Sequence, residues 1–280
     1  IWSQHVKIER GKHAKKIYNL KNTEKIIIST PMYHSISFRL IVLPVILGAT
    51  CIILKKFTTK GWFENIQKWK VSFSILVSDQ VEMVSSQFKK QNMKKIRSLK
   101  KLVSCCSPLK HEIKERLVKQ SNFEIFDTYG ASEVGTITNI NLKKEQKKIK
   151  SNGKVTLGYN VSILKNSKLT NVPFTNGEIC CHTKNIFTGY FGLMDKQKSN
   201  KALNKFFQTG DIGYFDKENY LYVTGRKKDI IIRGGVNIFP SDIEQILNRF
   251  PNIVESAVIG VEVKNLGERI YAFIRLKRNK

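Results

Sequence analysis

The sequence has few cysteines and none in a CxxC spacing. Its five cysteines are Cys51, the adjacent pair Cys105 and Cys106, and the adjacent pair Cys180 and Cys181. Cysteine-based zinc sites and dithiol redox sites typically use cysteines with two residues between them, and that spacing does not occur here. Disulfides are rare in the reducing cytoplasm. We therefore expect five small, reduced core residues in a cytoplasmic protein.

The sequence also lacks an apolar run of membrane-spanning length. The longest uncharged run, Leu40–Leu54, has fifteen residues and is interrupted by Pro44 and Gly48. A transmembrane helix needs roughly 20 apolar residues, so we predict no membrane span but a buried helix followed by a strand. The first residue is Ile1 and no signal sequence follows it. We expect the chain to be part of a longer one.

Acidic residues are scarce. Lys and Arg number 49 against 22 Asp and Glu, giving a net charge of +27 and a pI near 9.9. Such charge suits nucleic acid, a membrane surface or nucleotides. The lysines are spread along the chain, however, and we interpret Lys89–Lys101, Lys143–Lys150, Lys227 and Lys228 as solvated faces and flanks. No groove-reading motif occurs, and no specific nucleic-acid partner is predicted.

The composition is that of a globular protein: of the 280 residues, 41% are hydrophobic and 10% aromatic. Apolar runs alternate with helical periodicity from the start of the chain, which indicates an α/β fold. We predict strands at Lys25–Thr30 and Ala49–Leu54 and helices at Phe38–Leu47 and Trp62–Trp69. The fold class is thus α/β, a large body of parallel-rich sheets with helices and a β-rich subdomain, followed by a small, incomplete α+β domain.

Turn and cap residues divide the rest of the chain. Ser107 followed by Pro108 is typical of a helix N-cap and first turn. The strand Phe123–Phe126 is predicted to end in the loop Asp127–Gly135, the kind of position where α/β sheets bind ligands. Ser241 and Glu244 have the spacing of a capping box. We predict three domains, at residues 1–150, 151–228 and 229–280.

Two short motifs carry candidate chemistry. Tyr129–Glu133, YGASE, offers an aromatic face, a bend at Gly130, a hydroxyl and a carboxylate, which can stack a base, bind a phosphate and hold Mg²⁺. Thr209–Asp211, TGD, places a carboxylate at the start of a hairpin, where an aspartate can accept two ribose hydroxyls. Arg226 lies at the far end of the same hairpin. Each motif alone is also compatible with an ordinary turn.

Taken together and in order, the motifs resemble the adenylate-forming superfamily of acyl-CoA synthetases, firefly-type luciferases and peptide-synthetase adenylation domains. The resemblance extends from about Ile26 to Phe273. In chain order the motifs are PMYHS (Pro31–Ser35), SPL (Ser107–Leu109), YGASE (Tyr129–Glu133), GEI (Gly177–Ile179) with GY (Gly189–Tyr190), TGD (Thr209–Asp211), GRKKD (Gly225–Asp229), GG-NI-P-DIE (Gly234–Glu244) and GVEVKNLGERIYAF (Gly260–Phe273).

The resemblance implies a nucleotide site with Mg²⁺. By it, Tyr129 would stack on adenine, Ser132 would bond the α-phosphate of ATP or AMP, and Glu133 would hold the Mg²⁺ that bridges the ATP phosphates. Asp211 would accept the ribose hydroxyls, and Arg226 would assist. Ser132 and Glu133 would thereby act in catalysis. Tyr129 and Gly130 would form the start of this nucleotide-binding loop.

The resemblance also implies the acyl and thiol steps. His34 would lie beside the site of carboxylate activation, as a further catalytic residue. Asp229 would be the hinge about which the small domain turns, and Gly234 and Gly235 would admit the pantetheine thiol, since glycine has no Cβ. Asn237 stands where carrier-loading enzymes usually have arginine, which favours coenzyme A over a carrier protein.

The implied reaction is an ATP-dependent acid–thiol ligation. A fatty or aryl carboxylate attacks the α-phosphate of ATP, pyrophosphate leaves, and the thiol of CoA then displaces AMP from the acyl-AMP. The sequence predicts neither the particular acid nor the oligomeric state.

The sequence departs from the family pattern in three places. The family's phosphate loop does not occur before Ile26, its catalytic lysine is expected beyond Lys280, and Cys105 and Cys106 replace two small residues in the wall of the adenine and acyl pocket. A catalytically inactive or split nucleotide-binding fragment therefore stays open as an alternative.

Overall fold

The computed structural model describes residues 1–192, 206–233, 236–263 and 267–277. The chain forms two compact units, and each is described by itself. The first comprises residues 1–161, 181–207 and 219–221, and the second comprises residues 162–180, 208–218 and 222–280. Among the helices that the structure describes, none has both the length and the apolar composition to cross a bilayer.

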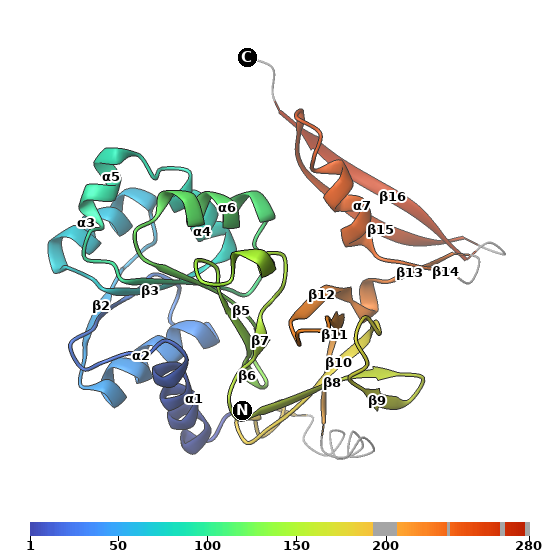
Figure 1. The fold of residues 1–280 in the computed structure, drawn as a ribbon, viewed down its shortest axis with the longest axis horizontal. Coiled ribbons are helices and arrows are strands. Elements are labelled where there is room, and N and C mark those ends of the chain that lie inside the picture. Colours follow the sequence, from blue (N-terminus) through green and yellow to red (C-terminus); the bar gives the residue numbers. More distant parts are fainter. Residues whose placement is uncertain (193–205, 234–235, 264–266, 278–280) are drawn as a thin grey trace. The chain divides into compact units, whose positions relative to one another are not determined.

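The first unit is built on a seven-stranded sheet (Figure 1). Its spatial order is β2 (Thr50–Ile53), β1 (Lys25–Ile28), β3 (Phe73–Val77), β4 (Lys101–Cys105), β5 (Glu124–Ala131), β6 (Gly135–Asn141) and β7 (Lys154–Val155). The strands from β2 to β5 pair in parallel, and β6 and β7 pair antiparallel. The predicted parallel-rich sheet is confirmed.

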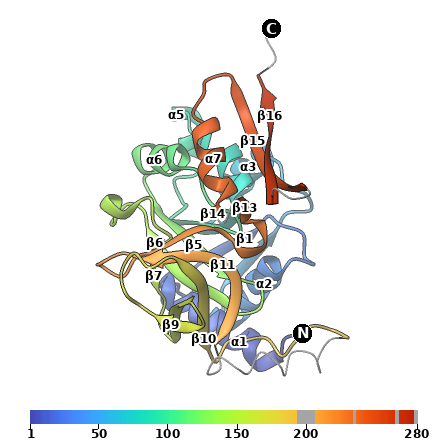
Figure 2. The same ribbon diagram turned by 90° about the vertical axis from the view of Figure 1, so that its right-hand side faces the viewer.

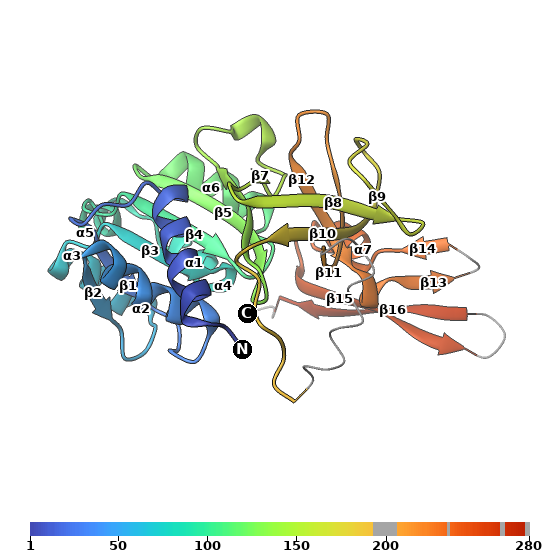
Figure 3. The same cartoon turned by 90° about the horizontal axis from the view of Figure 1, so that it is seen from below.

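Helices cover both faces of this sheet. On one face lie α1 (Gln4–Ile17) and α2 (Ser35–Leu47), packed side by side (Figure 3). On the other lie α3 (Thr59–Trp69), α4 (Ser78–Ser85), α5 (Lys90–Lys95) and α6 (His111–Gln120) (Figure 1). A short 3₁₀ turn, η1, follows at Gln146–Lys148. Strands buried on both faces explain why their residues form continuous apolar runs rather than alternating ones.

The core beneath α2 joins that helix to the middle of the sheet. Leu40 and Leu43 of α2 pack with Ile26 and Ile28 of β1, and all four side chains are fully buried. Each such burial is worth roughly 1.5–3 kcal/mol relative to exposure. The predicted buried helix running into a strand is confirmed, with a left-handed Gly48 closing α2 at φ 66°.

The predicted start of α6 was wrong. The helix begins at His111 with Lys110 as its N-cap, so Ser107 caps nothing. Residues 108–110 lie outside the helix, and the carbonyl oxygen of Ser107 accepts the hydroxyl of Ser78. The helix buries Ile113 and Leu117.

The predicted loop after Phe126 was also wrong in its extent. The chain from Asp127 to Ala131 continues β5 and pairs antiparallel with β6. Only the three residues between Ala131 and Gly135 form a turn. The antiparallel ladder satisfies backbone groups that a loop would leave to water.

The second unit contains a five-stranded sheet in the order β12, β11, β10, β8 and β9. Their bounds are β8 (Tyr159–Lys165), β9 (Lys168–Thr170), β10 (Gly177–Thr183), β11 (Phe207–Phe215) and β12 (Leu221–Arg226). The predicted β-rich composition after residue 151 and the hairpin of β11 and β12 are confirmed.

The end of the chain adds smaller elements to this unit. They are η3 (Lys227–Asp229), β13 (Ile231–Arg233), β14 (Val236–Ile238), α7 (Pro240–Leu247), β15 (Ile253–Val263) and β16 (Gly267–Leu276). The last two strands form a long antiparallel ribbon, with α7 beside it (Figure 2). β13 pairs antiparallel with β14.

The predicted capping box in α7 was wrong. The N-cap is Phe239, with no side-chain cap bond. Ser241 instead donates its hydroxyl proton to the carbonyl oxygen of Thr224, 2.5 Å away, and Glu244 accepts the backbone N–H of Val258 at 2.8 Å. Tertiary partners therefore take the two side chains that would close the box.

The cysteine prediction holds only in part. All five cysteines are free thiols, and Cys180 and Cys181 are buried. Cys51 and Cys106 are exposed, and Cys105 is partly buried. Cys51 lies on the outermost strand β2, and Cys106 lies just past the end of β4. Both thiols are therefore at the edge of the sheet and exposed to solvent.

Candidate functional site

The turn between β5 and β6 presents the hydroxyl of Ser132 and the carboxylate of Glu133. The pairing shifts register between Tyr129 and Gly130, which forms a bulge. A Cβ on Gly130 would lie 2.1 Å from the carbonyl oxygen of Gly135, so no side chain fits there. The glycine thus lets the two strands close tightly. YGASE lies at the end of a strand and in a tight turn, not in an open loop.

Arg10 of α1 holds this turn by its backbone. The buried guanidinium donates to the carbonyl oxygens of Ser132 at 2.8 Å, of Glu133 at 2.6 Å, and of Asn185 at 2.8 and 3.0 Å. Burial, together with the charge of Arg39, lowers the pKa of Arg10 to about 10. The side chain therefore stays protonated at neutral pH and fixes the turn.

The start of helix α2 lies against the same turn. The hydroxyls of Ser35 and Ser132 are 3.2 Å apart. His34 is the N-cap residue of α2, makes no side-chain cap bond, and contacts the exposed ring of Tyr33 with ring centroids 4.6 Å apart. The structure therefore brings His34 and Ser132 to one region of the first unit. The N-terminus of a helix of this length favours an anion there.

The carboxylate of Glu133 has a tyrosine partner. Tyr190 donates its hydroxyl proton to Oε1 of Glu133 at 2.6 Å, and the backbone N–H of Phe187 donates to the carbonyl oxygen of Glu133 at 2.7 Å. Burial first, and then the bond to Glu133, raise the pKa of Tyr190 to about 12. Tyr190 is thus a neutral donor that orients the carboxylate.

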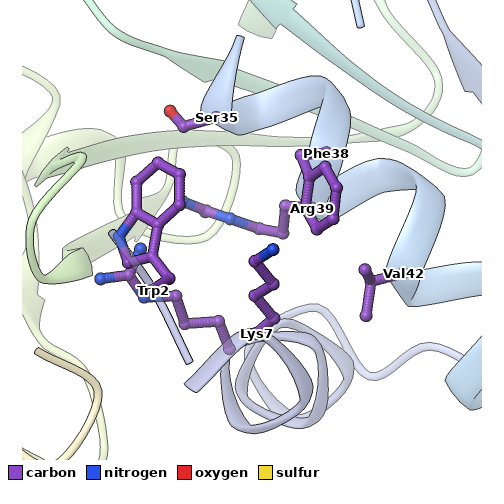
Figure 4. Close-up of a pocket in the computed structure, with 7 residues that line it drawn as sticks. Trp2, Lys7, Ser35, Phe38, Arg39 and Val42 are labelled. Carbon is purple, nitrogen blue, oxygen red and sulfur yellow. The ribbon is translucent and has the colours of Figure 1, made fainter. Parts of the chain in front are cut away.

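A small, open pocket lies beside this turn (Figure 4). Figure 4 shows Lys7 and Arg39 between the rings of Trp2 and Phe38. The ammonium of Lys7 lies 4.2 Å from the ring centre of Phe38, and Arg39 donates to the hydroxyl of Thr136 at 2.9 Å. The lining residues are Trp2, Lys7, Arg10, Ser35, Phe38, Arg39 and Val42. They combine cationic and apolar side chains with no carboxylate, which suits an anion with an apolar body.

The second unit brings Asp211 and Arg226 together. Nε of Arg226 lies 3.3 Å from Oδ1 of Asp211, with the aspartate side chain 13% exposed and the arginine side chain 62% exposed. Asp211 lies within β11 rather than at its start. Its backbone N–H donates to the hydroxyl of Thr209, and Gly210 between them has φ 76°, which glycine adopts without strain.

The segment after Arg226 differs partly from its prediction. Lys227 is not a purely solvated flank: its ammonium lies 2.9 Å from the buried carboxylate of Glu178. Asp229 ends η3, and its role as a hinge stays a prediction. Gly234 and Gly235 lie outside the described residues.

The predicted site residues thus fall into two groups, one in each unit. Sequence reasoning missed the residues that hold the first group, above all Arg10, Arg39 and Trp2, whose indole donates to the carbonyl oxygen of Ser132 at 3.1 Å. Tyr190 lay within a recognised GY motif but was given no role. The missed arginines had no sequence signal, because their partners are distant in the chain.

A buried ion pair positions β5 below the turn. The ammonium of Lys114 on α6 lies 2.7 Å from Oδ2 of Asp127, and each side chain is 5% exposed. Burial raises the pKa of Asp127, although the charge of Lys114 opposes that effect. Lys114 also donates to the carbonyl oxygen of Ser151 at 3.2 Å. The pair ties the strand to the helix that covers it.

The described residues hold no divalent-metal site made of protein ligands alone. Among the described residues, no three His, Cys, Asp or Glu side chains lie close enough to form a protein-only metal site. Mg²⁺ rarely needs one, because it keeps several waters and takes one or two carboxylates plus substrate phosphates. Glu133, half-buried on its turn, fits that requirement.

Family models match most of the chain. The model described as "AMP-binding enzyme" matches residues 4–191, and the model described as "AMP-binding enzyme C-terminal domain" matches residues 242–280. Among curated relatives, 2-succinylbenzoate–CoA ligase of Bacillus subtilis is 27% identical over 255 residues, which cover 90% of this chain and 51% of that protein. Indoleacetate–CoA ligase of Aromatoleum aromaticum is 29% identical over 261 residues, covering 92% and 50%.

Solved structures share the fold. The o-succinylbenzoate CoA synthetase of Bacillus subtilis in complex with its acyl-adenylate intermediate superposes with a TM-score of 0.90 at 22% identity, covering 100% of this chain and 56% of that one. The same enzyme with ATP and magnesium ion gives a TM-score of 0.88 at 23% identity, covering 99% and 57%. The chain spans about half the length of the curated relatives it matches.

Proposed function

Because this chain belongs to the family of AMP-binding enzymes, we propose that it serves the ATP-dependent ligation of a carboxylic acid to coenzyme A through an acyl-AMP. The observation that carries the proposal is the turn of Ser132 and Glu133, fixed by Arg10 and lying beside the start of α2 at His34. A hydroxyl, a carboxylate and a helix N-terminus meet there. Together they suit a nucleotide phosphate and its metal ion.

In this proposal, different residues of the first unit bind different parts of the nucleotide. Tyr129 stacks on adenine, with Gly130 allowing the close turn, and Ser132 donates to the α-phosphate. Glu133 holds Mg²⁺, which when bound neutralises phosphate charge. Tyr190 keeps the Glu133 carboxylate oriented by donating to one of its oxygens. Catalysis then rests mostly on positioning and on charge neutralisation.

The second unit contributes the ribose and thiol contacts in the same proposal. Asp211 accepts the ribose hydroxyls and Arg226 orients it, which their 3.3 Å ion pair supports. Asp229 serves as the hinge, and Gly234 and Gly235 admit the thiol of CoA. We also propose the domain boundaries at residues 150 and 228.

The acid is proposed to be fatty or aryl, with an aryl acid favoured. The pocket beside the turn supports this, since the rings of Trp2 and Phe38 can contact an apolar body while Lys7 and Arg39 balance a carboxylate. His34 lies near the carboxylate being activated. The relatives that act on 2-succinylbenzoate and indoleacetate agree with an aryl acid. Action in the cytoplasm belongs to the same proposal.

The test is calorimetric binding of AMP to the 280-residue chain, followed by pyrophosphate exchange with a panel of fatty and aryl acids. Ser132→Ala should weaken AMP binding by about tenfold or more, because a hydrogen bond to a charged group is worth about 1.5–3 kcal/mol. The matched control is Ser86→Ala, an exposed serine just after α4 whose hydroxyl donates to the carbonyl oxygen of Met83.

The outcomes separate the two candidate functions. AMP binding together with acid-dependent exchange supports the ligase. AMP binding without exchange for any acid supports the alternative, a nucleotide-binding fragment, which the half-length match to relatives motivates. Equal AMP affinities for the wild type and Ser132→Ala would remove Ser132 from the site.

A further inference from the structure

Three cationic side chains line the small pocket beside the turn of Ser132 and Glu133. Lys7 and Arg10 come from α1, and Arg39 comes from α2. The described residues of the lining include no aspartate or glutamate. Neither Lys7 nor Arg39 forms an ion pair with a carboxylate in the part of the chain that the structure describes. The pocket therefore has an excess of positive charge, which favours an anion.

This charge also affects two neighbouring groups. Burial, and then the charge of Arg39, lower the pKa of Arg10 to about 10. The same two causes lower the pKa of His13 to about 4. Both directions are those expected of a cationic group that lies close to another cation. An anion bound to Arg39 would reduce this repulsion.

Arg39 and Lys7 can both donate to one anion. The guanidinium of Arg39 has five N–H groups, and its Nη1 donates to the hydroxyl of Thr136 at 2.9 Å, which fixes the direction of the group. The ammonium of Lys7 lies 4.2 Å from the ring centre of Phe38. Both charged groups lie between the rings of Trp2 and Phe38 (Figure 4). A carboxylate placed there would accept charge-assisted hydrogen bonds from both.

The pocket follows one stripe of α2. Ser35, Arg39 and Val42 are four and three residues apart, so their side chains lie on the same face of the helix. The hydroxyl of Ser35 is 3.2 Å from that of Ser132, which places the start of the stripe at the turn. Arg39 follows one helical turn later, about 6 Å further along the axis.

Close packing of α1 against α2 closes the far end of the pocket. A Cβ on Gly11 of α1 would lie 2.4 Å from Cδ1 of Ile46 and 3.7 Å from Cγ1 of Val42. The glycine therefore lets the two helices approach closely beside Val42. The resulting pocket is small and open, so it suits one carboxylate group rather than a whole acid.

We propose that Lys7 and Arg39 bind a second carboxylate of the acid, so that the acid is an aryl dicarboxylate. This inference rests on the proposed function. The carboxylate that is activated has to meet the α-phosphate at Ser132, and Arg39 lies one helical turn beyond Ser35. A single molecule can occupy both positions only if it carries two carboxylates. A rigid ring with carboxylates at opposite ends meets that requirement, and the rings of Trp2 and Phe38 contact its apolar body.

The test uses two stable mimics of an acyl-AMP, in which a sulfamoyl group replaces the phosphate. One carries the 4-carboxybenzoyl group and the other the 4-methylbenzoyl group. The adenosine part holds the activated end at Ser132 in both, so the mimics differ only in the group directed away from it. In calorimetric titration of the 280-residue chain, the carboxy mimic should bind at least about tenfold more tightly, the strength of one charge-assisted hydrogen bond.

Variants of the two cations test the assignment. Lys7→Met and Arg39→Met should each reduce this preference to about threefold or less, because each removes one charged donor. Neither should change the affinity for the methyl mimic as much. Lys7→Arg keeps the charge and should keep the preference. Lys15→Met, which removes an exposed lysine of the same helix outside the pocket, is the matched control.

The outcomes keep the inference apart from the proposed function. Equal affinities for the two mimics, or a preference that survives both Lys7→Met and Arg39→Met, would overturn the second carboxylate while nucleotide binding stands. Failure of both mimics and of AMP to bind would overturn the proposed function itself. Inorganic pyrophosphate that binds the complex with the methyl mimic, and loses affinity in Lys7→Met, would assign the two cations to the phosphates of ATP and overturn the inference.

Discussion

Lowering the pH should destabilise the first unit through one buried histidine. His13 of α1 is 8% exposed and stacks on the ring of Tyr159 with centroids 5.1 Å apart. Its Nε2 has no hydrogen-bond partner among the residues that the structure describes. Burial, with the charge of Arg39, lowers the pKa of His13 from 6.5 to about 4, although a bond to the backbone of Leu157 opposes this.

The direction follows from proton linkage. The folded pKa of His13 lies below its unfolded value, so the unfolded chain takes up the proton first as the pH falls from 6.5 towards 4. The free energy of unfolding therefore decreases across that window. The shift from 6.5 to about 4 corresponds to about 3 kcal/mol in total, of which about 2 kcal/mol is lost by pH 5. That loss is a large fraction of the stability of a typical domain.

The assay is urea unfolding followed by tryptophan fluorescence at pH 7 and pH 5. Trp2, Trp62 and Trp69 all belong to the first unit, so the signal reports on that unit alone. His13→Phe keeps an aromatic ring but cannot titrate, and should lose about 2 kcal/mol less than the wild type on acidification. His5→Phe, an exposed histidine on the same helix, is the matched control.

The quantity compared is the change in the free energy of unfolding between pH 7 and pH 5 within each variant. A substitution that lowers stability equally at both pH values therefore does not affect the comparison. Equal losses for the wild type and His13→Phe would refute the reasoning. The reasoning would also be refuted if His5→Phe lost about 2 kcal/mol less stability on acidification than the wild type.

Three further changes follow from contacts near the turn. Arg10→Met should destabilise the first unit by about 1–3 kcal/mol, because the partly buried carbonyl oxygens of the turn lose their charged donor. The exposed Lys12→Met is the control in urea unfolding, and equal unfolding midpoints for the two variants would contradict the role of Arg10. Lys114→Met should cost about 3–5 kcal/mol by leaving the Asp127 carboxylate buried and unpaired, and the added change Asp127→Leu should recover much of that loss. Gly130→Ala should cost about 1–3 kcal/mol through its 2.1 Å backbone clash, and an unchanged thermal midpoint would contradict the bulge geometry.

Much of the fold could be predicted from local residue patterns. The continuous apolar run at Lys25–Thr30 gave its strand, and the turn between two alternating segments gave the hairpin of β11 and β12. These signals depend on neighbours in sequence, so periodicity detects them. The cap prediction at Ser241 failed because tertiary contacts outweighed a local preference: Ser241 and Glu244 bond distant backbone groups instead. The cap prediction at Ser107 failed because the helix begins four residues later, at His111.

The candidate site was likewise predicted only in part from the sequence. The motifs gave Ser132, Glu133 and Asp211 because a family pattern preserves their spacing. Arg10 could not be predicted, since its acceptors lie 122 to 175 residues away.

The anchoring of the turn by Arg10 has a consequence for folding kinetics. Contacts that close such long loops carry a large entropic cost and form late compared with local ones. The hairpin of β5 and β6 can close early, but its turn carbonyls gain their donors only when α1 docks. During refolding, secondary structure should therefore return before nucleotide affinity does, and the delay between the two should lengthen in Arg10→Lys.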